Sequence, residues 1–426
     1  MTIELLFGKH TIALNLPSDI NVRLIEKYPM PVVADDRKAI AQAFNTPINS
    51  PTLAELASGK KNACILICDI TRPVPNGLIL EPLVETLIHA GMDKENITIM
   101  VATGLHRPNE GPELKELIGS DTIFHSIRIE NHFARDQKAH ADLGHTSRGI
   151  PISIDKRFLK ADLRIVTGLV EPHFMAGYSG GRKVVAPGVA GQDTILNFHM
   201  AHILENEKAG NCILEGNPLH QAQLEIIRAI GDIYAVNVVI DDKRQLGKVT
   251  FGAIEPSHLE AVRFLKQYGE IDVDKKFRTI VTSAGGYPLD KTYYQTIKGM
   301  VSPMDILEPG GTIIIASECS EGMGSPEFIS AQKMLYNQGP KTFMKTLYGR
   351  KKARIDEWQT QMLLKPLCRG SIKLYAPHLT DDQLQQTCVD SISCLEDAII
   401  ASVKAQNSKD VAVIPEGPYV VPRYKG

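Results

Sequence analysis

Charged and titratable side chains stand directly after several short apolar runs that are typical of β-strands. They are Asp69 and Arg72 after the first run, His106 after the second, His173 after the third and Asp290 after a later one. Ligands of open parallel sheets bind beyond the carboxyl ends of the strands, so we expect these groups to meet at one edge of a sheet. Each signal alone is weak, because Asp, Gly and Pro are ordinary turn formers. Together they predict an active site built from ionisable groups.

A second candidate segment reads Tyr-Ser-Gly-Gly-Arg-Lys. Its glycines, Gly180 and Gly181, let backbone N–H groups turn toward an anion, and Arg182 and Lys183 add positive charge. It is not a Walker loop, because the first glycine is wrongly spaced and Val184 replaces the Mg-binding hydroxyl residue. The spacing fits a phosphate cradle and a plain tight turn equally well. A desolvated lysine here could also be a covalent anchor.

A pair of histidines follows. If the segment is helical, His199 and His202 lie one turn apart, with Glu205 a further turn on. Imidazole suits nickel, copper or zinc, although the His-Glu-x-x-His pattern of zinc proteases is absent. A surface helix that carries two histidines is the simpler interpretation.

A predicted helix in the last third of the chain has one polar and one apolar face. Ile297, Met300 and Val301 fall on the apolar side, and Gln295 and Lys298 fall on the other. The polar face fits exposure to solvent. It also fits a carboxylate-binding surface, because a protonated lysine and an amide both donate hydrogen bonds.

Alternating strands and helices must position these groups. The expected strands are Ala63–Cys68, Ile97–Ala102, Leu163–Thr167, Ile233–Ile240, Thr279–Ser283, Thr312–Ala316 and Val411–Ile414. Helices are expected over Gly77–Ala90 and Pro218–Ile230, each before a glycine stop signal. Near-continuous apolar strands alternating with helices predict an α/β protein with parallel or mixed sheets. A charged segment near residue 270 divides it into domains 1–270 and 271–426.

Composition restricts the possible partners. The chain has 426 residues, and 47 Lys and Arg against 49 Asp and Glu give a net charge of −2, which removes the electrostatic case for nucleic acid. Seven cysteines, without the two-residue spacing of redox or zinc pairs, indicate a reducing compartment. No apolar run approaches the ~18 residues of a membrane helix, and no signal-like segment is present. We expect a cytoplasmic protein without a membrane partner.

Taken in order along the chain, these motifs resemble those of the nickel-pincer lactate racemases. The first half contains the blocks Asp69-x-Thr-Arg-Pro, Ala-Thr-Gly-Leu-His106-Arg-Pro, Glu-Pro-His173-Phe-Met-Ala-Gly, Ser-Gly-Gly-Arg-Lys183 and His199. The second half contains Gly-Gly-Tyr-Pro-Leu-Asp290, Tyr294-Gln295-x-x-Lys298-Gly, Gly-Gly-Thr-Ile-Ile and Asp356-Glu-Trp358. The blocks span nearly the whole chain, so the resemblance is specific.

The resemblance implies a cofactor and residues that hold it. The cofactor would be a nickel pincer nucleotide, pyridinium-3-thioamide-5-thiocarboxylate mononucleotide with Ni, attached through Lys183. His199 would be the protein ligand of the nickel, and soft sulfurs beside a neutral imidazole suit that metal. Asp69 would help to position the cofactor, and its phosphate would be held by Ser179, Gly180, Gly181 and Arg182. Proteins of cofactor synthesis are implied as partners.

The resemblance also implies racemisation of a small 2-hydroxy acid in a cleft between the domains. Removal of hydride from Cα gives a planar 2-keto acid that can be reduced on either face. His106 and His173 would serve as acid and base on opposite sides, which their ordinary pKa near ~6.5 permits. The carboxylate would be held by Arg72, Tyr294, Gln295 and Lys298, and Trp358 would help to cap the pocket. Lactate is expected first, with malate or another larger 2-hydroxy acid as an alternative.

Other functions fit the residues less well. A 2-hydroxy acid oxidoreductase, NAD-dependent or NAD-independent, would act on the same substrates, but a nicotinamide enzyme needs a Gly-x-Gly-x-x-Gly turn that the sequence lacks. A zinc hydrolase built on His199, His202 and Glu205 lacks a further ligand with the expected spacing. A non-enzymatic nucleotide-binding module would leave His106 and His173 without a task.

Overall fold

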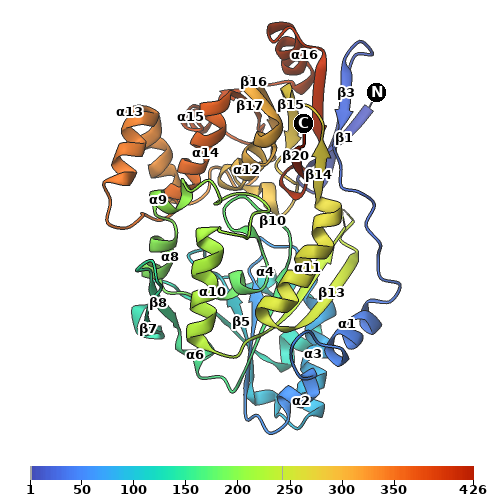
Figure 1. Ribbon diagram of the computed structural model, residues 1–426, viewed down its shortest axis with the longest axis vertical. Helices are drawn as coiled ribbons and strands as arrows, with labels where there is room; N and C mark the ends of the chain where they lie inside the picture. Colours follow the sequence, from blue (N-terminus) through green and yellow to red (C-terminus); the bar gives the residue numbers. More distant parts are fainter. Residues whose placement is uncertain (1, 242) are drawn as a thin grey trace.

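Two six-stranded sheets, each covered by helices, form the protein (Figure 1). The computed structural model describes residues 2–241 and 243–426. The expected α/β class with parallel and mixed sheets is confirmed. No helix within these described ranges is long and apolar enough to cross a membrane.

The first sheet supplies the strand ends expected to carry the site. Its strands, in spatial order, are β13 (Leu246–Ala253), β12 (Tyr234–Ile240), β9 (Leu163–Leu169), β4 (Ala63–Cys68), β5 (Ile97–Ala102) and β6 (Arg128–Asn131). Neighbouring strands run parallel except β12 and β13. The carboxyl ends of the parallel strands therefore lie at one edge.

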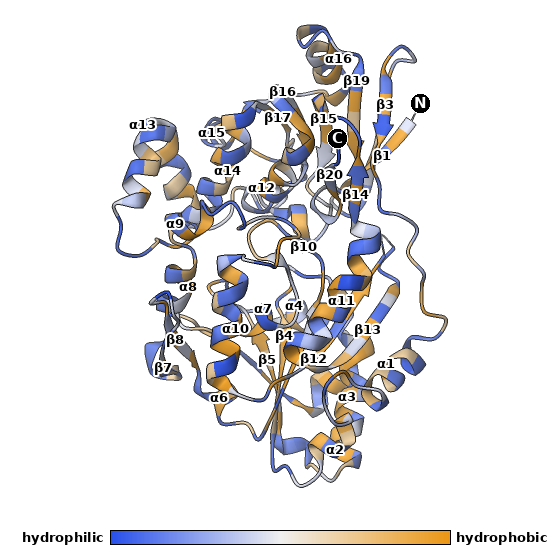
Figure 2. Cartoon of the chain, in the orientation of Figure 1, coloured by the Kyte–Doolittle hydropathy of each residue, from blue (hydrophilic) through white to orange (hydrophobic). Residues whose placement is uncertain are grey.

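Burial on both faces explains the apolar strands of this sheet. Ile65 and Ile67 of β4 share a core with α3 (Asn76–His89), whereas Leu66 belongs to the core that includes α10 (Pro218–Ile230). Alternate side chains of a strand point to opposite faces, so helices on both sides leave no polar face. Figure 2 shows β4 and β5 as mostly hydrophobic and α10 as two-sided.

The second sheet is wholly parallel. Its strands, in order, are β18 (Asp390–Ser391), β17 (Ser371–Tyr375), β16 (Leu307–Ala316), β15 (Phe277–Ser283), β19 (Asp410–Ile414) and β3 (Asn21–Leu24). Its helices include α12 (Tyr293–Val301), α13 (Pro326–Tyr348), α14 (Glu357–Arg369) and α16 (Leu395–Ala405). One hydrophobic cluster contains residues of α10, α12 and α14, so the two units share apolar packing.

The N-terminal segment packs on the second sheet, not the first. A hairpin of β1 (Thr2–Phe7) and β2 (His10–Asn15) precedes β3, which pairs with β19. The buried side chains Ile3, Leu5 and Leu14 pack with Val281 and Ile314 of the second sheet. The sequence predicted a division into residues 1–270 and 271–426. In the structure, β1, β2 and β3 instead pack with the second sheet. The apolar hairpin needs a cover, and the sequence does not reveal which sheet provides it.

The remaining helices and strands include elements that pack against the two sheets, such as α1 (Asp36–Asn45) and α11 (Ile254–Gly269), and shorter connecting elements. They also include α2 (Leu53–Ala57), α4 (Gly111–Ile118), α5 (Asp121–Ser126), β7 (His140–His145), β8 (Pro151–Asp155), α6 (Lys156–Leu159), β10 (Pro172–His173), β11 (Gly177–Tyr178), α7 (Arg182–Val185), α8 (Gln192–Phe198), α9 (Ala201–Leu204), β14 (Glu270–Val273), α15 (Asp381–Gln386) and β20 (Val421–Tyr424).

Candidate active site

A cavity of about 150 Å³ between the two units brings most of the expected site residues together. Side chains from the first unit that line it are Asp69, Arg72, His106, His173, Ser179, Gly180, Lys183 and His199. The second unit contributes Tyr294, Gln295, Lys298 and Trp358. Gly181 and Arg182 are the expected residues that do not line it. An adjoining cavity of about 700 Å³ shares Asp69, His106 and Tyr294 with it.

The ends of parallel strands deliver the groups of the first unit. Asp69 follows β4, His106 follows β5, and His173 lies just beyond β9, so three strand exits meet at this cavity. The exit of β15 does not reach it. Asp290 is buried elsewhere and accepts hydrogen bonds from the backbone N–H groups of Gly8 (2.7 Å) and Glu318 (3.3 Å), so it fixes the turn of the N-terminal hairpin.

His106 is paired with a carboxylate. Its Nδ1 lies 2.5 Å from Asp69 Oδ2, and the Thr71 hydroxyl donates to Asp69 Oδ1 over 2.6 Å. The His106 side chain is 44% exposed, so its partial desolvation disfavours the charged imidazole only in part, and the Asp69 carboxylate raises the pKa of His106. Burial likewise opposes the charge of Asp69, yet His106 and Thr71 lower the pKa of Asp69. With Nδ1 bound to Asp69, Nε2 is the nitrogen left for proton exchange.

His173 has the opposite arrangement. Its Nδ1 accepts hydrogen bonds from the backbone N–H groups of Met175 (3.3 Å) and Ala176 (3.1 Å), within the turn between β10 and β11. Burial, followed by the charge of Lys183, lowers the pKa of His173 well below its usual value. The neutral ring with an accepting Nδ1 carries its proton on Nε2. The two imidazoles therefore rest in different protonation patterns.

Three cationic side chains share the cavity. Burial and the nearby guanidinium of Arg72 lower the pKa of Lys183 to about 8, and the same causes lower the pKa of Lys298 well below its usual value. Arg72 Nε lies 3.4 Å from a carboxylate oxygen of Glu171. This concentration of positive charge favours an anionic ligand, and a lowered pKa makes a lysine amine more nucleophilic.

The double-glycine turn is built for close backbone packing. Gly180 has φ +78°, and a Cβ there would lie 2.7 Å from Val170 Cγ2. The N–H of Gly181 donates to the side-chain oxygen of Asn237 over 2.9 Å, and the Ser179 hydroxyl donates to the Leu169 carbonyl over 2.7 Å. Ser179 and Gly180 still line the cavity, while the N–H of Gly181 is engaged inside the protein.

Arg182 is buried beneath this turn. Its Nε donates to His220 Nδ1 over 2.7 Å, and one terminal nitrogen donates to the carbonyls of Ala176 (3.0 Å) and Tyr178 (3.1 Å). The other terminal nitrogen lies 2.8 Å from His258 Nε2. These contacts use the guanidinium to hold the loop between His173 and Lys183.

His199 presents a free ring nitrogen to the cavity. It caps the end of α8, and its Nδ1 donates to the Ile195 carbonyl over 2.8 Å, which leaves a lone pair on Nε2. Burial lowers the pKa of His199 to about 4, so the ring is neutral near pH 7. A carbonyl-bound Nδ1 with a free Nε2 is the usual arrangement of a metal-binding histidine.

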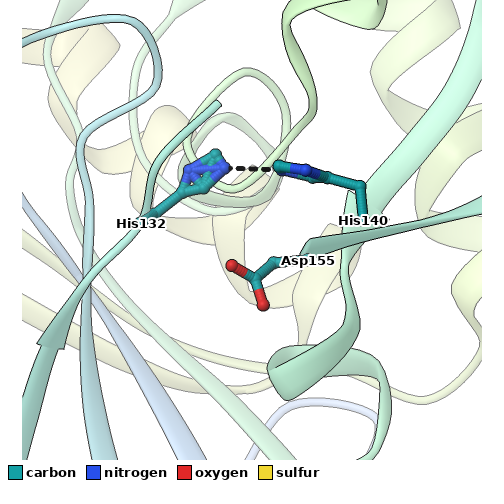
Figure 3. A group of neighbouring side chains, drawn as sticks. All are labelled: His132, His140 and Asp155. Carbon is teal, nitrogen blue, oxygen red and sulfur yellow. Dashed lines mark hydrogen bonds between the residues drawn. The ribbon is translucent and has the colours of Figure 1, made fainter. Parts of the chain in front are cut away.

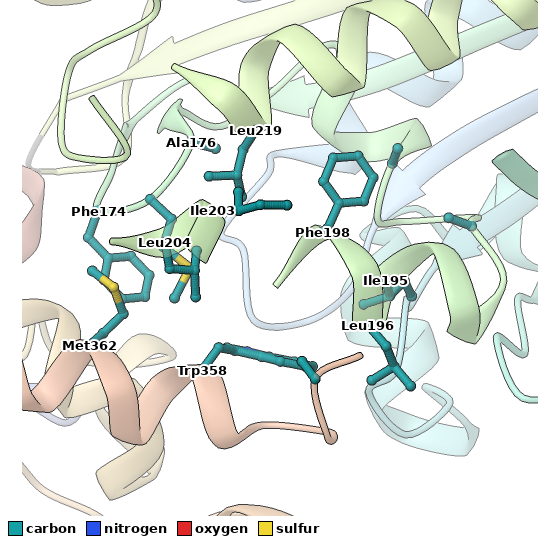
Figure 4. Packing of buried hydrophobic residues seen from close by; sticks show 14 of the residues in the cluster. Phe174, Ala176, Ile195, Leu196, Phe198, Ile203, Leu204, Leu219, Trp358 and Met362 are labelled. Atoms are coloured by element: carbon teal, nitrogen blue, oxygen red, sulfur yellow. The ribbon is translucent and has the colours of Figure 1, made fainter. Parts of the chain in front are cut away.

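Trp358 covers this imidazole from the second unit. The two rings stack with centroids 4.2 Å apart and planes 25° from parallel. The indole N–H donates to the Tyr294 hydroxyl over 3.1 Å. Figure 4 shows Trp358 opposite the helix end that carries Ile195 and Phe198. Trp358, the residue expected to cap the pocket, thus contacts His199 of the first unit and Tyr294 of the second.

His202 and Glu205 do not join His199. The helix is interrupted between α8 and α9, so His199 and His202 do not lie on one continuous helix. His202 is exposed, and Glu205 accepts a hydrogen bond from Gln361 Nε2 over 2.7 Å. The three-donor site of a zinc hydrolase therefore does not form here.

Asp356 and Gln359 also line the cavity, although the sequence assigned neither of them a role in the site. Asp356 lines it in a left-handed conformation (φ +61°) just before α14, and its Oδ2 accepts from the Ser325 hydroxyl over 2.5 Å. Burial raises the pKa of Asp356. Gln359 donates to the Tyr294 carbonyl over 2.6 Å. The position of Asp356 two residues before the only tryptophan was the available signal.

Comparison with known proteins identifies relatives over the whole length. Sequence models described as the lactate racemase N-terminal and C-terminal domains match residues 7–211 and 273–421. The chain is 31% identical to a lactate racemase of Thermoanaerobacterium thermosaccharolyticum, over 99% of both chains. It is also 31% identical to a lactate racemase of Lactiplantibacillus plantarum, over 90% of both chains.

Solved structures agree with this assignment. The lactate racemase apoprotein of Thermoanaerobacterium thermosaccharolyticum superimposes with a TM-score of 0.90 at 29% identity, covering 99% of this chain and all of that one. A crystal structure of a Thermotoga maritima protein gives a TM-score of 0.71 at 17% identity over 93% of this chain, which shows the same fold.

Proposed function

This chain belongs to the lactate racemase family, and from that premise we propose that it is an isomerase that interconverts D- and L-lactate, or a closely related short-chain 2-hydroxy acid. The observation that carries the proposal is one cavity that holds three cationic side chains and three histidines, of which His106 and His173 are the acid–base pair. Racemisation needs an acid–base group for each enantiomer and a fixed site for the carboxylate. A 2-hydroxy acid oxidoreductase has no comparable need for two histidines.

The donor set of the cavity fits a covalently held nickel pincer nucleotide. Lys183 supplies an amine whose pKa is lowered to about 8, and His199 supplies a neutral imidazole with a free Nε2. Ser179 and Gly180 line the same cavity as Lys183. We assign Lys183 as the covalent anchor and His199 as the metal ligand. When bound, the group supplies a hydride acceptor that can return the hydride to either face of a keto acid.

The cationic residues bind the substrate carboxylate. Arg72 offers guanidinium N–H groups besides the Nε that faces Glu171, and the charge of Lys298 lies close enough to Arg72 to lower the pKa of the lysine. A planar guanidinium can bind a carboxylate through two hydrogen bonds. Tyr294 and Gln295 lie on the same helix as Lys298 and complete the site. This end of the cavity fixes the carboxylate, so the carbon that reacts is held between the histidines.

The two histidines move the hydroxyl proton. His106 exchanges it at Nε2 while Asp69 holds Nδ1 and stabilises the imidazolium. His173 exchanges its proton at Nε2 and acts as the acid from the imidazolium form. It takes up a second proton, which displaces the Nδ1 contacts with Met175 and Ala176, and it returns to the neutral ring when the proton is given to the substrate oxygen. One histidine therefore accepts the proton of one enantiomer while the other returns a proton to its mirror image.

Trp358 and the apolar wall around it exclude water. The indole lies over His199, and its N–H fixes the Tyr294 hydroxyl. Water at the reacting carbon would compete for the hydroxyl proton and weaken every charge interaction in the cavity. The second unit thus covers the cavity on the side of His199.

Lactate deuterated at Cα tests this function. The enzyme, made together with the cofactor-synthesis proteins, should racemise it without NAD and retain much of the deuterium in the product in ordinary water. Quenched samples should contain some 2-keto acid. Complete exchange of the label with solvent would overturn the hydride-transfer mechanism and leave a proton-abstraction racemase. Parallel assays with malate distinguish the two substrate classes, because faster racemisation of malate would reject lactate as the main substrate.

A further inference from the structure

Outside the cavity, three metal-binding side chains lie together in the first unit. His132 follows β6, His140 begins β7 and Asp155 ends β8 (Figure 3). His140 and Asp155 are direct partners in the antiparallel register of β7 and β8. All three side chains are buried, and none of them lines the active-site cavity. The cluster is therefore a separate feature of the fold.

The two imidazoles face each other with lone pairs available. His132 Nε2 and His140 Nε2 lie 3.0 Å apart, so they cannot both carry a proton. His140 Nδ1 donates to the Asp136 carbonyl over 2.7 Å, which leaves the lone pair of His140 on Nε2. This carbonyl contact is the one that commonly orients a metal-binding histidine.

His132 also carries a buried nitrogen without a partner. Its Nδ1 has no hydrogen bond, and the side chain is 1% exposed. If Nε2 of His132 donates to His140, then Nδ1 of His132 carries no proton, and its lone pair points into the protein. Buried polar atoms nearly always have a partner, so the cluster lacks a donor or a cation.

A network of ion pairs orients Asp155. Both of its oxygens accept from Arg157, at 3.0 Å from Nε and 2.7 Å from a terminal nitrogen. The same guanidinium also binds Glu130 over 2.5 Å, so two carboxylates share it. Arg128, the other partner of Glu130, is exposed, and solvent screens its charge. Arg157 thus orients the Asp155 carboxylate beside the two histidines, and the two carboxylates and two guanidiniums of this network balance in charge.

We propose that His132, His140 and Asp155 bind a zinc ion. Two imidazole nitrogens and one carboxylate oxygen are a donor set that zinc accepts, with water as a fourth ligand. The donor atoms lie within 4.8 Å of one another. In a tetrahedral site, bonds of about 2.1 Å place the ligand atoms about 3.4 Å apart, so the most widely separated pair closes by up to about 1.4 Å on binding. The 3.0 Å between the two Nε2 atoms is already short enough.

The zinc would stabilise the turn that carries His106. The Thr103 hydroxyl donates to the His132 carbonyl over 2.6 Å, and the His106 N–H donates to the Thr103 carbonyl over 2.9 Å. The zinc would link the segment after β6 to the β7–β8 hairpin. Through Thr103, this link would hold the backbone of the turn that carries His106. The role is structural, because the three ligands lie outside the cavity.

Zinc content of the purified apoprotein tests the proposal. The chain, stripped with a chelator, incubated with zinc and dialysed, should retain about one zinc ion per molecule and melt at a higher temperature than the stripped protein. His140→Ala should abolish both effects. His145→Ala is the matched control, because His145 is exposed near the other end of β7. His199→Ala is the second control and should keep the zinc.

The outcomes are distinct. The proposal is overturned if wild type retains no zinc, or if His140→Ala retains as much zinc as wild type. Loss of zinc in His199→Ala would overturn it as well. If circular dichroism shows that His140→Ala is unfolded, His140→Gln and His132→Gln replace it, since an amide keeps hydrogen-bonding capacity but is a poor zinc ligand. A folded glutamine variant that retains zinc would also overturn it.

Discussion

The imidazole of His199 stacks on the indole of Trp358 across the boundary between the two units, with ring centroids 4.2 Å apart. One ring belongs to the end of α8 and the other to α14. The orientation of the imidazole therefore depends on how the second unit sits on the first. The indole N–H extends this contact to the Tyr294 hydroxyl.

Substitutions of Trp358 should separate the stacking from the hydrogen bond. Trp358→Phe keeps an aromatic ring but loses the bond to Tyr294, so kcat/KM should fall about fivefold, as expected for ~1 kcal/mol. Trp358→Ala loses both and should cost about tenfold more. Tyr294→Phe removes the same hydrogen bond together with a contact to the substrate, so adding Trp358→Phe to Tyr294→Phe should cost little more. Fully additive losses in this double-mutant cycle would contradict the coupling.

Nickel content should depend on His199 and not on His202. His199→Ala removes the neutral imidazole in the cavity, and the protein made with the cofactor-synthesis proteins should retain much less nickel. His202→Ala is a matched control, because this side chain is exposed one short helix away. Metal analysis of the two folded variants measures the difference. A similar nickel loss in both would argue against His199 as the specific ligand.

Lys183 should carry a covalent mass in the active enzyme. Burial and Arg72 lower the pKa of its amine to about 8, which favours attachment to a cofactor arm. Peptide mass spectrometry should find the added mass on Lys183 and not on Lys298, the other buried lysine of the cavity. Lys183→Ala should fold and contain little nickel. Full activity with an unmodified Lys183 would exclude the anchor.

The pair of Asp69 and His106 predicts a pH dependence of the reaction. The carboxylate raises the pKa of His106 against the effect of partial desolvation. Asp69→Asn removes that charge, so the pKa of His106 should fall. In the direction that uses His106 as the acid, the alkaline limb of kcat/KM should then move to lower pH. Rate profiles in both directions measure this, and an unmoved limb would refute the assignment.

The same pair should affect stability within a defined pH window. The raised pKa of His106 stabilises the folded chain below the unfolded value of ~6.5, and this contribution is lost as the pH rises through the folded value. The lowered pKa of Asp69 stabilises the folded chain above the unfolded value of ~3.9, and this stabilisation is lost as the pH falls through the folded pKa. The melting temperatures of wild type and Asp69→Asn should differ most between about pH 4 and 6.5.

Loss of either catalytic histidine should slow both directions. Each turnover uses one ring as base and the other as acid, so His106→Gln and His173→Gln should each reduce kcat by about 10² or more. Glutamine preserves some hydrogen bonding and limits structural change. A fall of less than about tenfold in either variant would place that histidine outside the proton path.

Much of the fold and most of the cavity followed from the sequence. Strands β4 and β5 have the expected bounds, because continuous apolar runs between turn signals leave little ambiguity. Strand exits predicted the meeting of Asp69, His106 and His173, since parallel strands end at one edge. The polar side of α12 faces the cavity through Gln295 and Lys298, as one of two interpretations expected.

The remaining features depend on tertiary packing that local patterns do not encode. Arg182 lies inside the protein with His220, about 40 residues away in the sequence, so a loop motif could not distinguish it from a phosphate ligand. Asp290 follows a strand like the other exits, but its carboxylate binds Gly8 at the start of the chain. His202 appeared to pair with His199 only under a continuous helix, which breaks at His199.

The pairing of β3 with β19 has a consequence for how the protein is made. Asn21 of β3 and Asp410 of its partner strand are 389 positions apart in the chain, so the partner strand is synthesised much later. During translation the apolar hairpin before β3 therefore waits without its cover. The first sheet contains no residue beyond 253 and can assemble while synthesis continues. The second sheet closes only after residues 410–414 have been made, so its apolar surface stays exposed for longer than that of the first sheet.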